Sequence, residues 1–387
     1  MFTMQQIYKA YFDCRKSKRN TINALKFEFN LENNLHELLK ELNNRTYNPA
    51  RSVCFAVLEP TPREIFAADF KDRIVHHLLI NEIGEIFEKK FIFDSCSCRK
   101  NKGTHFCIDR LKNFIKKITK NYTKRTYYYQ LDISGFFMSI DKQILYNLIE
   151  SRIKKEKTAK KWENKILWLS KKIIFNEPTE NCIYKGNKNL LKLIPDRKSL
   201  FKAREGKGLP IGNYSSQFFA NIYLNELDQF IKRKLKCKYY VRYVDDIILL
   251  SKSRKELRLW KNKIDIFLQK NLLLKLNPKK QIFQSVDKGV DFLGYFIKPK
   301  YNLVRKRVKK NLKRKLYFYK KLLNYNNPDD KLLKKILSSI NSYYGHFKHA
   351  NSFRLRKHLH ENHFGILKKF FIPANKEFTH FKINKIK

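Results

Sequence analysis

The sequence predicts an α+β fold in which an antiparallel sheet carries helices on one face. The first observation is the order of elements between residues 125 and 271, which is strand, helix, glycine-rich loop, helix, hairpin and helix. The second is a β-prone run at 239–250 that suits a hairpin. The third is a basic C-terminal region whose apolar residues recur at helical spacing. Strands and helices mixed in this way build a sheet with helices packed on it.

The N-terminal region is predicted to be helical and then to form a strand. Asn48 and Pro49 mark the exit from the helix, because a residue before proline disfavours the helical conformation. Next we expect a strand that ends at Leu58, a turn at Pro60 and Pro62, and a long helix directly after this turn. The apolar residues that define the first helix recur three or four positions apart, with one adjacent pair: Leu31, Leu35, Leu38, Leu39 and Leu42.

The central region supplies one more strand and a glycine-rich loop. Residues 125–137, RTYYYQLDISGFF, are expected to form a strand, and from Asp141 onward the apolar spacing becomes helical. Residues 206–213, GKGLPIGN, are predicted to form a loop that leads into a helix over 215–231.

The C-terminal third is predicted to be mostly helical. A helix over about 254–271 follows the hairpin at 239–250, and a basic helical module of about 80 residues begins after Arg305. A turn at 324–330 separates its first two helices, and Asp329 suits the N-cap of the second one. The outward faces of this module are nearly all Lys and Arg, so its expected partner is a phosphate backbone.

The charge of the chain indicates a polyanionic partner. The 387 residues include 84 Lys and Arg against 35 Asp and Glu, which gives a formal net charge of +49. Basic side chains that neutralise phosphates and release counterions are the expected binding mode, and an anionic membrane surface is the lesser alternative. The hydrophobic content of 43% is far above that of a disordered basic tail.

The sequence favours a cytoplasmic protein. Its first residues lack the continuous apolar segment of a signal peptide, and no run approaches the ~20 apolar residues of a membrane span. The seven cysteines form no paired framework, which fits a reducing compartment.

Two adjacent carboxylates, Asp245 and Asp246, lie between a β-prone run and an aliphatic run. Ionised groups with apolar flanks are costly and adjacent like charges repel, so a divalent metal is expected to compensate. A structural turn would instead favour Asp-Gly or Asn-Gly. A third carboxylate, Asp132, follows another β-rich run. Three carboxylates at strand ends can hold two metal ions about 3.5–4 Å apart, which would activate a 3′-hydroxyl and stabilise a leaving pyrophosphate. Magnesium suits such oxygen ligands.

At this point the chain resembles a known family, the reverse transcriptases. The resemblance is carried by motifs in the order LDISGFF, GLPIGNYSSQFFANIYLNELD, YVDD, LKLNPKKQIF and DFLGYFI, and it covers about residues 31–296. It implies RNA-directed DNA synthesis on a template RNA with deoxynucleoside triphosphates (dNTPs), which gives an RNA/cDNA duplex. It also implies a right-hand polymerase fold, with fingers at 1–128, a palm at 129–304 and a thumb at 305–387.

The resemblance assigns roles around the acids. It implies that Asp132 and Asp245 bind both metal ions, that Ile133 belongs to the same metal site, and that Asp246 supports the charge cluster. The implied cofactors are two Mg²⁺ ions, for which Mn²⁺ can substitute. Lys280 matches a lysine that donates a proton to pyrophosphate.

The resemblance also implies a nucleotide site. Phe137, five residues after Asp132, matches the residue whose ring lies under the sugar and excludes a ribose 2′-hydroxyl. The alternative is Phe136 as the gate and Phe137 in the core, because adjacent strand residues face opposite ways. Arg99 and Lys102 match finger residues that hold the triphosphate, and a solvated charge run is the alternative there.

Further matches concern the middle motif, the template and the primer. Gly212 and Gln217 are implied to contact the nucleotide. Lys71 and Arg73 are implied to contact the template or the triphosphate. The FLGYF segment, with Gly294 and Tyr295, is implied to form the primer grip.

One departure from the family pattern indicates a subtype. Reverse transcriptases of retroviruses and group II introns usually carry Pro-Gln-Gly and then Ser-Pro, whereas this chain has Pro-Ile-Gly at 210–212 and Ser-Gln at 216–217. This pattern is similar to the reverse transcriptases of diversity-generating retroelements. It implies copying of a template-repeat RNA with errors at adenines, and a small basic accessory protein oligomer as partner. Ile211 and Arg99 are then the residues expected to set fidelity.

Other hypotheses stay open. A phage-defence-associated or group II intron-like bacterial reverse transcriptase is the main alternative. A non-catalytic RNA-binding protein on a polymerase scaffold is disfavoured by the intact acids, and an RNA-templated RNA polymerase is disfavoured by the bulk of Phe137.

Overall fold

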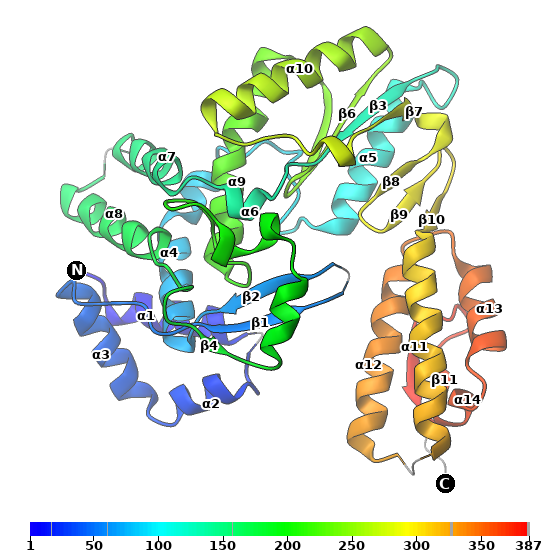
Figure 1. Ribbon diagram of the computed structural model, residues 1–387, viewed down its shortest axis with the longest axis horizontal. Helices are drawn as coiled ribbons and strands as arrows, with labels where there is room; N and C mark the ends of the chain where they lie inside the picture. The colour runs from blue at the N-terminus through cyan, green and yellow to red at the C-terminus, as the bar shows by residue number, and fades with distance from the viewer. Residues whose placement is uncertain (17, 60, 157, 326–327, 385–387) are drawn as a thin grey trace. The chain divides into compact units, whose positions relative to one another are not determined.

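The computed structural model describes residues 1–16, 18–59, 61–156, 158–325 and 328–384 (Figure 1). The chain divides into two compact units. The first unit holds residues 1–103, 129–249 and 255–282, and the second holds 104–128, 250–254 and 283–387. Within the described residues, no helix combines the length and the apolar character that crossing a membrane requires.

The first unit begins with helices, as the leucine pattern predicts. They are α1 (Met4–Arg15), α2 (Ile22–Glu28) and α3 (Leu31–Asn43). Leu35, Leu38 and Leu42 of α3 are buried, because residues three or four apart share one helix face. At the start of α1, Thr3 and Gln6 form a reciprocal capping box.

A second strand corrects the prediction of a helix directly after the proline turn. β1 (Val53–Val57) pairs antiparallel with β2 (Arg63–Ala67) and parallel with β4 (Ile183–Tyr184), and α4 (Phe70–Glu88) begins only after β2. Burial alternates along β2, which gives it the period of a strand. Pro60 lies outside the described residues.

The strand expected at 125–137 is shorter than predicted. β3 spans Tyr127–Leu131, and after a turn the chain forms the short helix α6 (Phe136–Ser139). The turn needs Gly135, whose φ is +54° and where a Cβ atom would lie 2.5 Å from the carbonyl oxygen of Arg197. The helix α7 (Lys142–Lys154) follows, capped by the side chain of Asp141, and then α8 (Lys160–Ile174).

A four-stranded sheet with the order β5-β6-β3-β7 contains the strands that precede the acids. The helix α9 (Tyr214–Gln229) is buried along most of its faces and leads through a π-helical turn (Phe230–Lys234) to β5 (Tyr239–Tyr243). β6 (Asp246–Ser251) and α10 (Arg254–Asn271) come next, and the helix bounds agree with the prediction. β7 (Ile282–Ser285) completes the sheet.

The second unit contains the C-terminal module predicted after Arg305, together with strands that precede it. It groups α5 (Thr104–Ile118) with an antiparallel sheet of β8 (Val290–Phe292), β9 (Tyr295–Ile297) and β10 (Asn302–Val304). The long helices are α11 (Lys306–Tyr325) and α12 (Asp330–Phe347), and Asp329 caps α12 as predicted. Residues 326 and 327 of the predicted turn lie outside the described residues.

Two strands were not predicted in this module. α13 (Phe353–His363) and α14 (Leu367–Phe370) lead to the antiparallel pair β11 (Phe371–Pro373) and β12 (Phe381–Ile383). Phe371 and Phe381 of these strands join the buried core of α11 and α12.

Candidate active site

Asp132 lies directly after β3 and is buried, with 5% of its surface exposed. Its Oδ2 accepts a hydrogen bond from Nδ2 of Asn277 at 2.9 Å, and its Oδ1 accepts one from Nζ of Lys280 at 2.8 Å. The main-chain N–H of Asn277 donates to the carbonyl oxygen of Asp132 at 2.8 Å. One oxygen of this carboxylate is thus held by a neutral amide and the other faces a cation.

Asp245 lies in the two-residue turn between β5 and β6, and β6 is the neighbour of β3 in the sheet. The other turn residue, Val244, has a φ of +55°, which a β-branched residue rarely adopts. Burial and the charge of Asp132 raise the pKa of Asp245 to about 6. The sheet therefore brings the two predicted acids within electrostatic range of each other.

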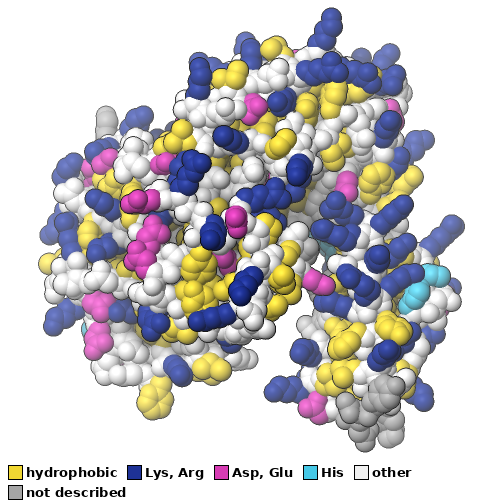
Figure 2. Space-filling view, viewed as in Figure 1, with side chains coloured by type: hydrophobic (Ala, Val, Ile, Leu, Met, Phe, Trp, Pro, Cys, Tyr) yellow, Lys and Arg dark blue, Asp and Glu magenta, His cyan; other side chains and the backbone are white. Residues whose placement is uncertain are grey.

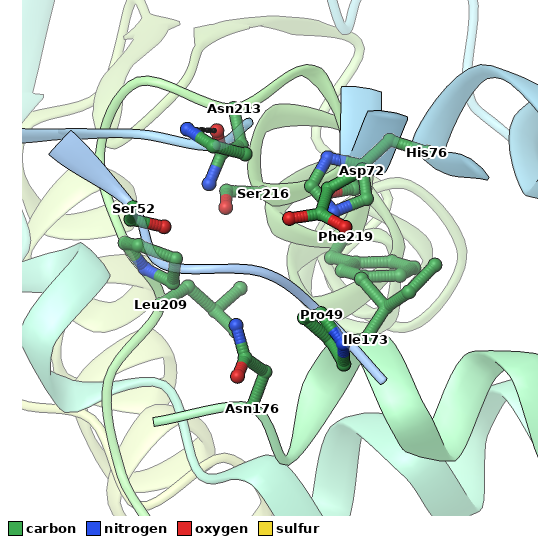
Figure 3. Close-up of a pocket in the computed structure, with 13 residues that line it drawn as sticks. Pro49, Ser52, Asp72, His76, Ile173, Asn176, Leu209, Asn213, Ser216 and Phe219 are labelled. Atoms are coloured by element: carbon green, nitrogen blue, oxygen red, sulfur yellow. Dashed lines mark hydrogen bonds between the residues drawn. The ribbon is translucent and has the colours of Figure 1, made fainter. Parts of the chain in front are cut away.

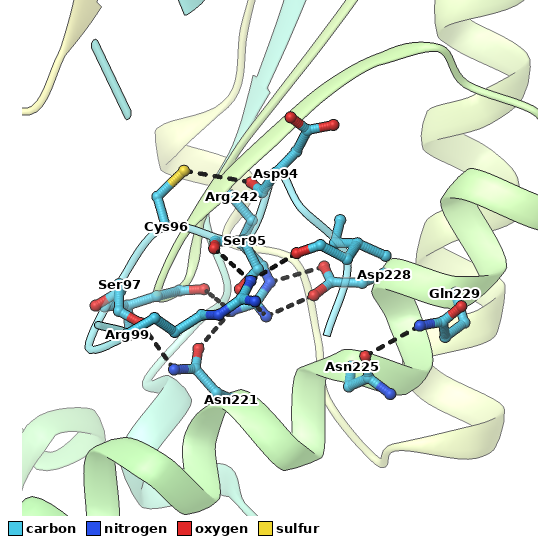
Figure 4. A network of polar contacts seen from close by, with 12 residues as sticks. Asp94, Ser95, Cys96, Ser97, Arg99, Asn221, Asn225, Asp228, Gln229 and Arg242 are labelled. Atoms are coloured by element: carbon cyan, nitrogen blue, oxygen red, sulfur yellow. Dashed lines mark hydrogen bonds and ion pairs between the residues drawn. The ribbon is translucent and has the colours of Figure 1, made fainter. Parts of the chain in front are cut away.

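Arg242 holds this turn by a hydrogen bond and belongs to a network of polar contacts (Figure 4). Its guanidinium and the carboxylate of Asp228 on α9 are both fully buried and form two hydrogen bonds, at 2.8 and 2.6 Å. A further N–H of the guanidinium donates to the carbonyl oxygen of Val244 at 3.0 Å, and another donates to Oγ of Ser95 at 2.9 Å. The carbonyl contact explains how a strained turn residue beside Asp245 is held.

The carboxylates of Asp132 and Asp245 are donors of the kind that a divalent cation needs. Carboxylate oxygens are the ligands that Mg²⁺ prefers, and a cation would offset both the burial and the charge of Asp132 that raise the pKa of Asp245. In the described part of the chain, however, no three His, Cys, Asp or Glu side chains form a metal-binding group. Asp246 already belongs to β6, where successive side chains alternate between faces. Asp132 and Asp245, with the buried Ile133 beside them, stay the predicted metal site, and the supporting role of Asp246 stays a prediction.

A pocket of about 230 Å³ gathers most of the predicted nucleotide residues. Phe137 of α6, Ile211 and Gly212 of the glycine-rich loop, and Gln217 of α9 line it, together with Val244 of the β5–β6 turn. These residues come from three distant segments of the sequence, and the pocket reaches the turn that carries Asp245.

Of the two candidate gate residues, only Phe137 lines the pocket. Phe136 is 3% exposed and belongs to the core, whereas Phe137 is half-buried. Their rings pack at 5.4 Å between centroids. Phe137 thus lies at the pocket and Phe136 in the core. Both residues belong to a helix, so the strand alternation that the prediction considered does not apply.

The loop at 208–212 is held on both sides. The N–H of Leu209 donates to the carbonyl oxygen of Phe137 at 2.9 Å, and the carbonyl oxygen of Ile211 accepts from the N–H of Phe66 on β2 at 2.8 Å. Gly212 has a φ of +127°, and a Cβ atom there would lie 2.8 Å from Cγ2 of Ile65. Only glycine therefore lets the loop approach β2 so closely.

Arg99 and Lys102 do not line this pocket, so their contact with a triphosphate stays a prediction. The buried guanidinium of Arg99 pairs with Glu88 at 2.6 Å and donates to the carbonyl oxygens of Ile92 and Ser95. Lys102 donates to the carbonyl oxygen of Phe93. Arg99 thus joins its loop to the end of α4, whereas Lys102 contacts its own loop, and the role of Arg99 in fidelity stays a prediction.

Arg63 is the cation that the sequence analysis missed. It is the first residue of β2, lines the pocket, and has a buried Nε atom without a hydrogen-bond partner among the described residues. The only local indication was a basic residue at the exit of a proline-containing turn. Its side of the hairpin could not be assigned before β2 was recognised.

The two residues predicted near the template differ in their surroundings. Lys71 pairs with Glu41 of α3 at 2.7 Å and so joins two helices. Arg73 lines an open groove of about 860 Å³ that also has Lys18 and Lys185 in its wall. Arg73 is therefore available to an anion, whereas Lys71 is engaged.

A small cavity between α4, α8 and α9 has a structural role (Figure 3). It measures only about 20 Å³, too little for a nucleotide. Asp72 accepts hydrogen bonds from the hydroxyl of Tyr47 at 2.7 Å and from the N–H of Ala50 at 2.9 Å, and burial raises its pKa to about 7. Burial also lowers the pKa of His76 to about 3. Asp72 therefore fixes the segment that leaves α3.

The residues of the predicted primer grip lie in the second unit. Gly294 packs against the ring of His346, and the buried Tyr295 donates its hydroxyl hydrogen to the carbonyl oxygen of His346 at 2.8 Å. The hydroxyl of Tyr295 is thus occupied inside this unit, and the contact of Gly294 and Tyr295 with a primer stays a prediction.

Comparison with known proteins gives the family. A family model described as reverse transcriptase (RNA-dependent DNA polymerase) matches residues 60–297. A putative COX1/OXI3 intron 2 protein of Saccharomyces cerevisiae is 21% identical, over 68% of this chain and 34% of that protein. The group II intron-encoded protein LtrA of Lactococcus lactis is 22% identical, over 74% of this chain and 53% of LtrA. Protein YkfC of Escherichia coli is 23% identical, over 74% of this chain and 75% of YkfC.

Among solved structures, telomerase from Candida albicans aligns with 11% identity and a TM-score of 0.44, over 87% of this chain and 64% of that chain. The chain spans about a third of the yeast intron protein and about half of LtrA. Residues 60–297, which the family model matches, contain the sheet and the pocket described above. The class of this region is that of the right-hand polymerases. Within that class, the chain belongs to the reverse transcriptase family.

Proposed function

We propose that the protein is an RNA-directed DNA polymerase that copies a template RNA into cDNA by two-metal nucleotidyl transfer. The observation that carries this proposal is the pocket next to Asp245, which Phe137 lines and whose turn Arg242 holds. The substrates are dNTPs, and the product is an RNA/cDNA duplex in the cytoplasm. Primer extension on a defined RNA template tests the activity.

In this proposal, residues of the chain bind the metal, donate a proton and position the nucleotide. Asp132 and Asp245, with Ile133 beside them, would hold Mg²⁺, and Mn²⁺ can substitute for it. When bound, the metal lowers the pKa of the attacking 3′-hydroxyl and offsets charge on the leaving group. Lys280, which pairs with Asp132, is the proposed proton donor to the leaving pyrophosphate. Phe137 supplies the floor under the sugar, and Gly212 and Gln217 line the nucleotide side of the same pocket.

The template and the duplex are proposed to bind through charge. Figure 2 shows Lys and Arg side chains spread over the elements of both units, with few acids among them. The groove lined by Arg73, Lys18 and Lys185 suits a single strand, because it combines cations with the aromatic ring of Tyr214. In this proposal residues 1–128 act as fingers, 129–304 as palm and 305–387 as thumb.

The finer proposal is that this is the error-prone, adenine-mutagenic enzyme of a diversity-generating retroelement, with a small basic accessory protein oligomer as partner. It rests on Ile211, which lines the pocket with an apolar side chain where the usual pattern has Gln. A group II intron-like enzyme is the second candidate, because the intron-encoded relatives above match most of this chain. A phage-defence enzyme is the remaining alternative.

Replacing Phe137 by Ala is expected to raise ribonucleotide incorporation, relative to deoxynucleotide incorporation, at least about tenfold, because a pocket discriminates by shape. The measurement is single-nucleotide primer extension with each of the two nucleotides. Phe136→Ala is the matched control, which should mainly lower stability because its ring belongs to the core. A gain of ribonucleotide use in the Phe136 variant alone would move the gate by one residue.

Replacing Ile211 by Gln is expected to lower misincorporation opposite template adenine about tenfold, or ~1.4 kcal/mol, without stopping synthesis. A Gln amide can donate and accept hydrogen bonds beside the nascent pair, which an aliphatic side chain cannot. The measurement is sequencing of cDNA made from one RNA, with the accessory protein present if the wild type needs it. Ile211→Leu controls for packing. If the wild type copies adenines as accurately as other bases, the retroelement proposal fails and the alternatives gain.

A further inference from the structure

A segment between α8 and the glycine-rich loop lies against the active site and had no role in the sequence analysis. It consists of three short 3₁₀ turns, Lys188–Leu193, Asp196–Lys198 and Leu200–Lys202. The carbonyl oxygen of Arg197 fills the space beside Gly135, where a Cβ atom would meet it at 2.5 Å. Gly135 lies in the turn that joins Asp132 to Phe137, so the middle turn of the segment touches the motif that carries both.

A buried carboxylate ties the same segment to β2. Glu64 is 1% exposed, and its side chain accepts hydrogen bonds from Oγ of Ser199 at 3.1 Å and from the N–H of Leu200. Burial raises the pKa of Glu64, and these donors lower it, so the segment supplies the groups that make this buried acid tolerable. Because Glu64 follows Arg63 in β2, the contact also fixes the segment beside that pocket cation.

The chain neighbours of Lys198 are thereby held, Arg197 against Gly135 and Ser199 by Glu64. Lys198 is half-buried, and both burial and the nearby charges of Lys280, Arg197 and Arg63 lower its pKa, whereas Asp132 raises it. In the described part of the chain, no carboxylate forms an ion pair with Arg63, Arg197 or Lys198. Cations gathered without matching acids repel one another, and a bound polyanion would relieve that repulsion.

Resting on the proposed polymerase function, we propose that Lys198 binds the phosphates of the incoming dNTP and of the pyrophosphate that leaves. A triphosphate is favoured over the template backbone because the turn that carries Lys198 packs on Gly135, between Asp132 and Phe137, and is tied through Glu64 to β2, whose first residue Arg63 lines the pocket with Phe137. Glu64 is the positioning residue that keeps the turn of Lys198 in place.

The test compares Lys198→Ala with Lys202→Ala, an exposed lysine of the same segment. Lys198→Ala should raise KM for all four dNTPs about tenfold, and the inhibition constant of pyrophosphate in parallel, since one charge-assisted contact is removed. The dissociation constant for the primer–template should stay within about twofold, because many other cations bind the backbone. Lys202→Ala should match wild type, and Lys198→Arg should recover most of the loss.

Three results would overturn the inference or separate it from its premise. An unchanged KM and pyrophosphate inhibition in Lys198→Ala would remove Lys198 from the nucleotide site. Weaker primer–template binding with an unchanged KM would assign Lys198 to the nucleic-acid backbone instead. Wild-type protein that makes no cDNA with any template would overturn the proposed polymerase function itself, whereas direct dNTP and pyrophosphate binding by wild type and Lys198→Ala would still test the site.

Discussion

Asp245→Asn is expected to abolish cDNA synthesis, by a factor on the order of a thousand or more, because several kcal/mol of metal-dependent stabilisation would be lost. Asp245 lies in the β5–β6 turn next to Asp132, and the amide of Asn carries no charge to offset a divalent cation. The measurement is primer extension by purified protein at saturating dNTP. Full extension by the variant would remove Asp245 from the catalytic site.

RNA binding, measured at several salt concentrations, separates lost chemistry from lost binding. RNA affinity should be nearly unchanged and should fall steeply between about 50 and 200 mM salt in both proteins, because the basic surface supplies it. A flat salt response would contradict the electrostatic proposal.

The stability of the same variant has a predictable sign. Burial and Asp132 raise the pKa of Asp245 to about 6, above the usual value near 4 for an aspartate. Ionisation therefore costs stability, and this cost appears as the pH rises through that window. In EDTA, Asp245→Asn should melt at or above the wild-type temperature at pH 7 and should lose this advantage below pH 4. A lower melting temperature of the variant at pH 7 would contradict the repulsion between the two acids.

Arg242→Met is expected to have the largest effect on stability, a loss of about 3–5 kcal/mol in the free energy of unfolding. The replacement leaves the carboxylate of Asp228 buried and without its bidentate partner, although Tyr240 still donates to it at 2.6 Å. Denaturant unfolding followed by circular dichroism measures this loss. A change below about 1 kcal/mol would mean that the buried pair is replaceable without cost.

A double variant distinguishes the two roles of Arg242. In Arg242→Met combined with Asp228→Leu, neither charge of this buried pair remains, so much of the lost stability should return. The carbonyl oxygen of Val244 still lacks its donor, so the turn that carries Asp245 stays loosely held and kcat should remain low. Recovery of kcat together with stability would show that Arg242 stabilises the sheet without positioning Asp245.

The sequence predicted what depends on neighbours in the chain. The helix over 254–271 was predicted with its observed bounds, and Asp329 was predicted as an N-cap, because helical periodicity and capping are decided within a few residues. The hairpin with Asp245 was visible for the same reason. The acids between apolar runs, and their spacing from Asp132, predicted a site at the ends of these strands.

The tertiary structure decided which charged groups face the site. Arg99 looked like a phosphate ligand in the sequence, but Glu88, on a helix before it, and two carbonyl oxygens of its own loop hold its guanidinium. The sequence pattern singled out neither Arg63 nor Lys198, yet β2 brings Arg63 to the pocket that Phe137 lines, and the 188–202 segment packs on Gly135, between Asp132 and Phe137. A cation binds whichever acceptors folding places next to it, and the contacts of Glu64 with Ser199 span 135 residues of sequence. Local pattern contains no information on such contacts, because they form only when distant strands and loops pack together.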